Sequence, residues 1–528
     1  MSDWNEGYVT DIGYTYGYYT ELNPLRTRLA LLNAGWVAPA MLTDGPACEL
    51  GMGQGVSVNV HAAASGNTWY GTDFNPSQAA FAQELAGASG VDAQGTRLFD
   101  EAFADFCQRP DLPDFSYIGV HGIWSWISDA NRAVIVDFVR RKLKVGGVLY
   151  ISYNTQPGWA AMVPMRDLLT EHVQVMGAPG NGIASRIDAS LAFAERLMDS
   201  NCHYAQANPQ VGVRLKRMQG VSRNYLAHEY FNRDWQPMSF SSMARWLEPA
   251  KLGYGCSAHY MDHLPALNFT PAQHALLLEQ PDAMFRETVR DFLVNQQFRR
   301  DYWIKGGRRL VPADQALALR QQRVILATPA ADVVMKVKAP VGEASLTPAI
   351  YAPVVAALAD HQVHSIGDLW QQLQAGATKP PISFAQLVEA MVLLVGKGDV
   401  VPVQDEAAVE KARPQTEKLN RHLLGMARNH ADISCVASPV SAAGVTLSRF
   451  QQLFLLAMLE AKRPVVDTPD PAVLAAFAWA ALQALGQRLL KDGKPMEAAQ
   501  DNINELTVQA TEFINKRLPT LRRLGIVE

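Results

Sequence analysis

Three glycines at alternating positions form the most informative motif in the chain. Gly51, Gly53 and Gly55 follow Glu49 and a short apolar run, and a helical pattern begins at Val56. Glycine at such positions lets the backbone turn sharply and approach a ligand where any Cβ would collide. The order of strand, glycine loop and helix is typical of a nucleotide site. We therefore predict that the loop binds a flat cofactor, with an ordinary tight turn as the alternative.

The residues at positions 49 and 56 distinguish between two cofactors. A dinucleotide fingerprint has glycine or alanine where this chain has Val56, and Glu49 would repel the pyrophosphate of NAD. S-adenosylmethionine contains no phosphate, and its ammonium and sulfonium groups are cationic. An acid directly before the glycines therefore favours S-adenosylmethionine, with S-adenosylhomocysteine as the product.

Two further acids follow the next two predicted strands. Asp73 comes 18 residues after Gly55, where a carboxylate can accept hydrogen bonds from both ribose hydroxyls. Asp100 is placed to accept a hydrogen bond from the adenine amino group, and Phe103 to pack against the ring. A purely structural role for Asp100 is an equal alternative.

The elements that position these residues alternate along the chain. Short apolar runs between residues 44 and 153 alternate with amphipathic stretches, as in a parallel sheet with crossover helices. The clearest helix spans 129–143 and ends before Gly146 and Gly147. We predict an α/β fold with a Rossmann-like domain. Its predicted strands are 47–50, 68–71, 96–99, 117–121 and 148–153.

The chain is long enough for two or three domains. Residues 161–224 lack strand signals and predict helices broken at 177–182, an insertion of the kind that often forms a lid. A further helix at 240–252 and apolar residues at 253–260 predict that the core sheet is completed there. A charged helical stretch at 285–301 leads into an irregular segment that ends near 346.

Beyond that segment, residues 351–403 show three helical patterns and a short strand, an order that resembles a winged helix. The C-terminal domain is thus predicted to be winged-helix-like and mostly helical. We divide the chain into a cofactor-binding core, a helical insertion or regulatory region and a C-terminal domain at residues 1–160, 161–306 and 346–528.

Composition excludes several classes of protein. The net charge of −4, from 47 Lys and Arg against 51 Asp and Glu, lacks the basic excess of a nucleic-acid-binding protein. The five cysteines show no CxxC spacing, which predicts neither a zinc site nor a disulfide framework. No secretory signal is evident, and the apolar stretch 473–490 is too short and interrupted to span a membrane. We expect a cytoplasmic protein with no metal, nucleic-acid or membrane partner.

With these residues in place, the chain resembles the bacterial class I methyltransferases that carry a methyltransferase regulatory domain, a group that includes the rickettsial protein-lysine methyltransferases. The resemblance covers most of the chain and is looser in the C-terminal part. It lies in four motifs in the expected order, at residues 49–55, 71–76, 121–126 and 152–159. It implies that Tyr14 and Tyr19 belong to an N-terminal segment that closes over the cofactor, and it places a regulatory segment from Tyr225–Phe231 through Phe298–Asp301. Related enzymes suggest a homodimer.

Methyl transfer is an in-line displacement on a sulfonium, so the protein must align a nucleophile, exclude water and dispose of one proton. Aromatic walls suit an amine nucleophile. For His121 we favour cofactor contact over a role as base, and core packing is the alternative for the aromatic residues. The candidate cofactor-binding residues are Tyr14, Tyr19, Glu49, Gly51, Gly53, Gly55, Asp73, Asn75, Asp100, Phe103, His121 and Gly122. The candidate catalytic residues are His121, Trp126, Tyr153 and Asn154. The candidate substrate contacts are Trp124, Trp159, Glu229 and Tyr230.

Three functions are compatible with these features. The first is a methyltransferase that modifies lysine side chains of a protein, which the large accessory region suits. The second is an O- or N-methyltransferase that acts on a glycan or small metabolite, which a closed lid over residues 161–224 would support and an open groove would count against. His121-Gly122 replaces the motif that many class I enzymes acting on amines or glycans carry after the fourth strand, so this loop does not fix the substrate. The third is a winged-helix regulator that only senses S-adenosylmethionine, which would require a basic helix within 346–403.

Overall fold

The computed structural model describes residues 7–10, 13–39, 44–178, 180–376, 381–461 and 469–527. Within these residues the largest sheet has seven strands, in the order β3-β2-β1-β4-β5-β7-β6. Strands β1 to β5 are parallel, and β7 is antiparallel to both of its neighbours. The predicted α/β class is confirmed. The strands are β1 (Ala47–Leu50), β2 (Trp69–Thr72), β3 (Arg97–Phe99), β4 (Phe115–Val120), β5 (Leu143–Asn154), β6 (Leu252–Ser257) and β7 (Phe298–Lys305).

Crossover helices connect the parallel strands, as the alternating pattern predicts. The side chain of Asn75 accepts a hydrogen bond from the Ser77 backbone N–H and Pro76 occupies the first turn, so α3 begins there. Helix α5 ends at Lys142 because Leu143 already belongs to β5. The helices of this part are α1 (Pro24–Asn33), α2 (Val56–Ser65), α3 (Pro76–Ser89), α4 (Phe103–Phe106) and α5 (Asp129–Lys142), and the 3-10 turns are η1 (Thr20–Leu22) and η2 (Trp124–Trp126).

The charged stretch 285–301 is not the continuous helix that its pattern predicts. Helix α14 (Ala283–Leu293) ends early, and Phe298–Lys305 forms β7 between β5 and β6. Two charged residues of this strand, Arg299 and Asp301, are buried and form an ion pair of 2.9 Å with each other. Strand β6 takes the edge position beyond β7, so the predicted completion of the core sheet near residues 253–260 is confirmed.

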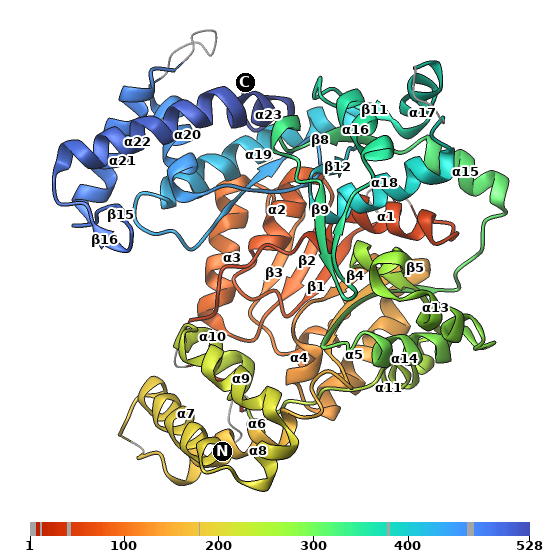
Figure 1. The fold of residues 1–528 in the computed structure, drawn as a ribbon, viewed down its shortest axis with the longest axis vertical. Coiled ribbons are helices and arrows are strands. Elements are labelled where there is room, and N and C mark those ends of the chain that lie inside the picture. Colours follow the sequence, from red (N-terminus) through yellow and green to blue (C-terminus); the bar gives the residue numbers. More distant parts are fainter. Residues whose placement is uncertain are drawn as a thin grey trace.

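The predicted helical insertion is confirmed between β5 and β6. Its first helices project from the lower end of the sheet in Figure 1 and enclose a small apolar core of their own. The predicted break at 177–182 separates α6 from α7, although one residue of it lies outside the described residues. The helices of the insertion are α6 (Val163–Val175), α7 (Ile183–Asp199), α8 (His203–Ala207), α9 (Pro209–Gln219), α10 (Arg223–Tyr230) and α11 (Phe240–Leu247), followed by the 3-10 turn η3 (Glu248–Ala250). Between β6 and α14 lie the 3-10 turn η4 (Tyr260–His263), α12 (Pro265–Asn268) and α13 (Pro271–Leu278).

The segment 306–346, predicted to be irregular, contains a helix and three strands. Strand β8 pairs with both strands of the following helical unit, so this unit begins before residue 346. The expected three helices and strand are present, while the winged-helix identification stays a prediction. These elements are α15 (Pro312–Arg320), β8 (Arg323–Leu326), η5 (Ala330–Asp332), β9 (Lys336–Ala339), β10 (Gly342–Ser345), α16 (Pro348–Ala357), β11 (His364–Ser365), α17 (Ile366–Ala375), α18 (Phe384–Lys397) and β12 (Val400–Pro402).

The last part of the chain packs against the cofactor-binding core. Helix α19 lies along α2 and α3, and the hairpin of β13 and β14 contacts α2 (Figure 1). No helix in the described ranges has both the length and the apolarity to cross a bilayer. The remaining elements are α19 (Glu406–Met426), β13 (Cys435–Ser438), β14 (Ala443–Thr446), α20 (Arg449–Glu460), α21 (Pro471–Ala484), β15 (Leu490–Lys491), β16 (Lys494–Pro495), α22 (Ala499–Glu512), η6 (Phe513–Arg517) and α23 (Leu518–Arg523).

Candidate active site

A pocket lies at the carboxyl ends of β1, β2 and β4, where open parallel sheets bind their ligands. It is bounded by the glycine loop, the segments after β2, β3 and β4, and the N-terminal segment. Its described lining residues are Tyr8, Tyr14, Thr15, Gly17, Tyr19, Glu49, Gly51, Met52, Gly53, Gln54, Asp73, Phe74, Gln78, Glu101, Ala102, Phe103, His121, Gly122, Ile123, Trp126, Ile127, Ser128, Asn131 and Asp234.

The glycine loop has the backbone geometry that its sequence predicts. Gly51, Gly53 and Gly55 all have positive φ values, of 69°, 54° and 68°, which side chains with a Cβ rarely adopt. A Cβ on Gly51 would lie 2.7 Å from the Ile123 side chain, and one on Gly55 would lie 2.3 Å from Ala82. The first two glycines line the pocket, whereas Gly55 allows α2 to pack closely on α3.

Two buried carboxylates face the pocket. Burial raises the pKa of Glu49 to about 8, and the nearby Asp73 adds to this rise. The Oε2 atom of Glu49 is buried without a hydrogen-bond partner. Burial also raises the pKa of Asp73 to about 6, although its carboxylate accepts hydrogen bonds from the backbone N–H groups of Gly53 and Asn75. An unpaired buried carboxylate suits a cationic ligand.

His121 lies at the end of β4 between two tyrosines. Its Nδ1 is 2.8 Å from the Tyr150 hydroxyl, and its ring stacks on that of Tyr19 with centroids 3.6 Å apart. Burial lowers the pKa of His121 to about 4. The ring is therefore neutral near pH 7 and a weak proton acceptor, which favours contact with the cofactor over a role as base.

The N-terminal segment forms part of the pocket wall. Tyr14 packs edge-on against His228 of α10 at 5.0 Å, and the Tyr19 backbone N–H donates to Ser57 Oγ at 2.8 Å. Both tyrosines line the pocket, as does Trp126, whose Nε1 donates to the Glu229 carbonyl at 3.2 Å. Thus α10 lies next to the pocket, while the described residues of α6 to α9 do not line it.

Several predicted cofactor residues lie outside the lining. Strand β3 ends at Phe99, and of the two acids that follow it Asp100 is exposed to solvent, whereas Glu101 lines the pocket. Asn75 caps α3 and contacts Asp73 through its backbone N–H. It therefore lies behind the carboxylate.

Two of the predicted catalytic residues also lie elsewhere. Alternate residues of a strand point to opposite faces. Tyr150 and Ser152 of β5 thus face the pocket side, and Tyr153 points to the other face, where its hydroxyl donates to Asp301 at 3.0 Å. Asn154 is buried, and its backbone N–H donates to Ser125 Oγ.

The four predicted substrate contacts are not in the pocket lining. Trp124 is fully buried and packs on Trp246. Trp159 and Tyr230 pack on each other within the helical insertion. Glu229 is half-buried, and burial raises its pKa to about 7. Its charge raises the pKa values of five tyrosines, at positions 8, 14, 19, 225 and 230.

Sequence reasoning missed Tyr8, Glu101 and Asp234 as lining residues. The unusual density of tyrosine between residues 8 and 19 was a usable signal for the first. The other two are acids in loops without a local pattern, so only the folded chain places them at the pocket. Among the described residues, no group of His, Cys, Asp or Glu could hold a metal ion.

Comparison with known proteins agrees with this geometry. Residues 222–305 match the family model described as a predicted methyltransferase regulatory domain. The uncharacterized protein sll1526 of Synechocystis is 36% identical over 524 residues, which cover 99% of each chain. An uncharacterized protein of Rickettsia prowazekii, RP789, is 28% identical over 37% of this chain and 35% of its own. The structure of PKMT2 from Rickettsia typhi in complex with AdoHcy matches with a TM-score of 0.66 at 15% identity, over 95% of this chain and 99% of that one.

Fold and site together define a class I S-adenosylmethionine-dependent methyltransferase. The chain belongs to the family of the Synechocystis protein, the class I methyltransferases that carry a methyltransferase regulatory domain. The residues present fit the cofactor. The unpartnered Glu49 Oε2 faces the pocket, and a Cβ on Gly122 would enter open space there.

Proposed function

We propose that this methyltransferase modifies the amino group of lysine side chains in a protein substrate. The observation that carries the proposal is the charge of the pocket. Its described lining contains four carboxylates and neither lysine nor arginine. Glu101 and Asp234 pair with Arg109 and Arg233 outside the lining, whereas Glu49 and Asp73 have no ion-pair partner among the described residues. Such a site attracts a cationic acceptor as well as a cationic cofactor.

The cofactor is assigned to the glycine loop and the acids around it. We propose that Glu49 faces its cationic groups, that Asp73 accepts from its ribose hydroxyls, and that Phe103 packs on its adenine. Tyr19 and His121 would form the wall that excludes water. When bound, S-adenosylmethionine supplies an electrophilic methyl group on its sulfonium.

Glu229 is the residue that we propose to hold the substrate ammonium. Its carboxylate has no ion-pair partner among the described residues, and the Trp126 indole donates to its backbone carbonyl at 3.2 Å. With a pKa raised to about 7 by burial, Glu229 is substantially ionised near pH 8. It could then accept the proton that the amine must lose before it attacks.

Aromatic rings support an amine over a hydroxyl acceptor. Tyr8, Tyr14 and Trp126 line the pocket, Trp126 contacts the Glu229 backbone, and aromatic faces stabilise the alkyl stem and cationic head of lysine. The structural likeness to PKMT2 of Rickettsia typhi supports the same proposal at the level of the fold. We propose a cytoplasmic protein as the substrate.

The test has two stages. Calorimetric titration of S-adenosylmethionine into the wild-type protein and Asp73→Ala should show binding that the variant loses. Radiolabelled methyl transfer onto fractionated host lysate should then label protein bands, at residues that acid hydrolysis identifies as methyllysine. Label in the glycan or small-molecule fraction would instead support the O- or N-methyltransferase alternative.

A further inference from the structure

We propose that Arg300, on strand β7 of the regulatory segment, is a positioning residue for the cofactor site. Through its ion pair with Glu21 it holds residues 13–22 where Tyr19 stacks on His121. The proposal concerns cofactor binding alone, so it is independent of the substrate.

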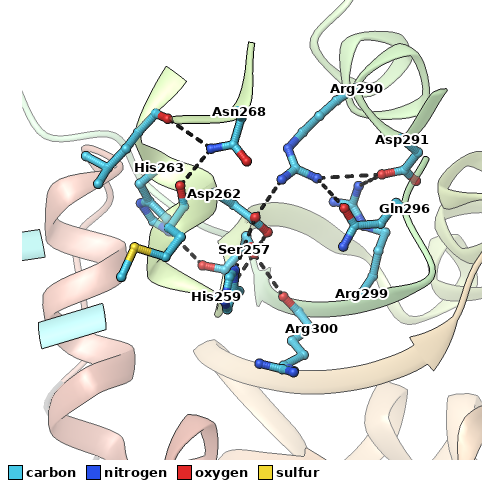
Figure 2. A network of polar contacts seen from close by, with 12 residues as sticks. Ser257, His259, Asp262, His263, Asn268, Arg290, Asp291, Gln296, Arg299 and Arg300 are labelled. Atoms are coloured by element: carbon cyan, nitrogen blue, oxygen red, sulfur yellow. Dashed lines mark hydrogen bonds and ion pairs between the residues drawn. The ribbon is translucent and has the colours of Figure 1, made fainter. Parts of the chain in front are cut away.

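Strand β7 presents different residues to its two faces. Arg299 and Asp301 point toward α14 and form ion pairs of 2.6 Å and 2.9 Å that involve Asp291 and each other. Arg300 and Tyr302 alternate with them and point to the opposite face. Figure 2 shows the guanidinium of Arg300 directed away from the cluster that surrounds Arg290. Arg300 therefore contributes only its backbone carbonyl to this network, where it accepts a hydrogen bond from Ser257 Oγ at 3.3 Å, and its side chain is free to reach another element.

Arg300 and Tyr302 both contact Glu21, which lies 279 residues from Arg300 in the sequence. Arg300 Nη1 is 2.7 Å from Glu21 Oε1, and the Tyr302 hydroxyl donates to the Glu21 carbonyl at 2.6 Å. Side-chain exposure is 14% for Glu21 and 32% for Arg300, so water screens the pair only in part. One strand thus anchors both the side chain and the backbone of Glu21.

The anchored residue is two positions from the ring that closes the pocket. Glu21 lies in the single turn η1, which begins directly after Tyr19. The next residue, Leu22, is fully buried and packs directly against Gly119. This packing requires glycine at position 119, because a Cβ on Gly119 would lie 2.6 Å from the Leu22 side chain. The turn therefore has little freedom while Glu21 is held, and the Tyr19 ring is fixed on His121 at a centroid distance of 3.6 Å.

A second route from β7 reaches the same histidine. Tyr302 is paired in register with Tyr150 of β5, and their rings lie 5.7 Å apart. Tyr150 in turn stacks parallel to His121 at 5.8 Å and contacts its Nδ1. His121 is thus contacted on one ring face by Tyr19 and at Nδ1 by Tyr150, and residues of β7 contact the elements that position both tyrosines. The regulatory segment can therefore alter cofactor affinity without touching the cofactor.

The experiment measures the Kd of S-adenosylmethionine by calorimetry and its dissociation rate by stopped flow on the full chain. Arg300→Met should raise Kd about tenfold, mainly through faster dissociation. With the cofactor in excess, kcat should stay within about twofold of the wild-type value, and the substitution should instead raise the KM for the cofactor. Glu21→Gln should behave alike, and Arg245→Met, an exposed arginine of α11, should bind as wild type.

The charge-exchanged double variant Glu21→Arg/Arg300→Glu distinguishes positioning from simple packing. Affinity restored to within about threefold of wild type would support the ion pair as the cause. Wild-type affinity in Arg300→Met and Glu21→Gln would overturn the proposal. An exchanged variant that folds but binds as weakly as the single variants would also overturn it. If Arg300→Met does not fold, Glu21→Gln removes the charge from the other side of the pair, and Arg300→Lys, which keeps the charge, should bind more tightly than Glu21→Gln.

Discussion

Glu49 illustrates how a binding residue can destabilise the protein that contains it. Its carboxylate is 2% exposed, and one of its oxygens has no partner. Folding raises the pKa of Glu49 from 4.5 to about 8. Between pH 4.5 and about pH 8, the Glu49 carboxyl is therefore protonated in the folded protein and ionised in the unfolded chain. Its contribution to the free energy of unfolding therefore falls as pH rises across this interval.

Glu49→Gln should separate stability from binding. Near pH 8 the variant without cofactor should melt at a higher temperature than wild type, because the amide needs no proton, and the difference should shrink toward about pH 5. A pKa unit corresponds to about 1.4 kcal/mol, so a stabilisation of about 1–3 kcal/mol is expected. Differential scanning calorimetry over this pH range measures it.

The same variant should bind the cofactor at least tenfold more weakly, because an opposite charge favours the ionised carboxylate. Wild-type affinity should rise between about pH 6 and pH 8 and then level off, and Glu49→Gln should lack this rise. Glu279→Gln, which changes an exposed carboxylate at the C-cap of α13, serves as the control in both assays. Equal affinity of Glu49→Gln and wild type at pH 8 would contradict the assignment of Glu49 to the cofactor.

Glu229 predicts a pH dependence of the methyl-transfer rate. Burial raises the pKa of Glu229 to about 7. If the ionised Glu229 carboxylate accepts the substrate proton, kcat/KM should therefore rise as the pH passes through about 7. Glu229→Gln should lose this rise and at least tenfold in rate, while the Kd of the cofactor changes little. Steady-state assays at several pH values provide the profile, with Glu248→Gln as the exposed control. An unchanged profile would assign the proton to another acceptor.

At the scale of elements, strand β7 is held by charges that lie inside the protein. Arg299 contacts Asp291, Asp301 and Glu287 within 3 Å and is almost fully buried. Arg299→Met should lower the free energy of unfolding by about 3–5 kcal/mol, because it leaves Asp301 buried without a cation and Asp291 with only the 3.7 Å contact to Arg290. Arg421→Met, on the exposed face of α19, should change it by less than about 0.5 kcal/mol. Urea unfolding followed by tryptophan fluorescence tests both variants.

This strand also shows where sequence reasoning ends. The five parallel strands could be predicted because each is a short apolar run beside a helical pattern, so the signal is local. Residues 298–305 contain two arginines and an aspartate, a pattern that predicts an exposed element. Their partners, Glu21 and Asp291, become visible only in three dimensions. Local pattern therefore located the glycine loop and Asp73, whereas the family resemblance located the tyrosines at positions 14 and 19.

At the scale of the whole molecule, the C-terminal part reaches the cofactor segment through contacts that no motif indicates. Asn23, which directly follows η1, donates through its side chain to the Ala442 carbonyl at 2.8 Å. Arg26 donates to the Val395 carbonyl at 2.7 Å. The described part of 346–403 has no arginine, and Lys397 pairs with Asp399 at 2.8 Å. This region therefore offers no basic helix for a nucleic-acid regulator and is placed to support the N-terminal segment.

Gly444 of β14 gives a test of that support. A Cβ at this position would lie 3.0 Å from three carbons of the Tyr18 ring, which is too close for ordinary contact. Gly444→Val fits an extended strand, so its effect should come from displacing Tyr18 and with it the adjacent Tyr19. We expect the Kd of S-adenosylmethionine to rise about fivefold, with a change in melting temperature of less than about 3 °C.

The control for Gly444→Val is Gly425→Ala, in helix α19, where a Cβ meets no neighbouring atom. That variant should bind the cofactor as wild type and melt slightly higher, because alanine favours a helix over glycine by about 1 kcal/mol. If Gly444→Val also binds as wild type, the C-terminal hairpin does not position the segment. If it binds weakly only because it has largely unfolded, the melting curve reveals this directly. Weaker binding by a folded variant would place a determinant of cofactor affinity some 370 residues in sequence from Asp73, in a part of the chain that contains no cofactor motif.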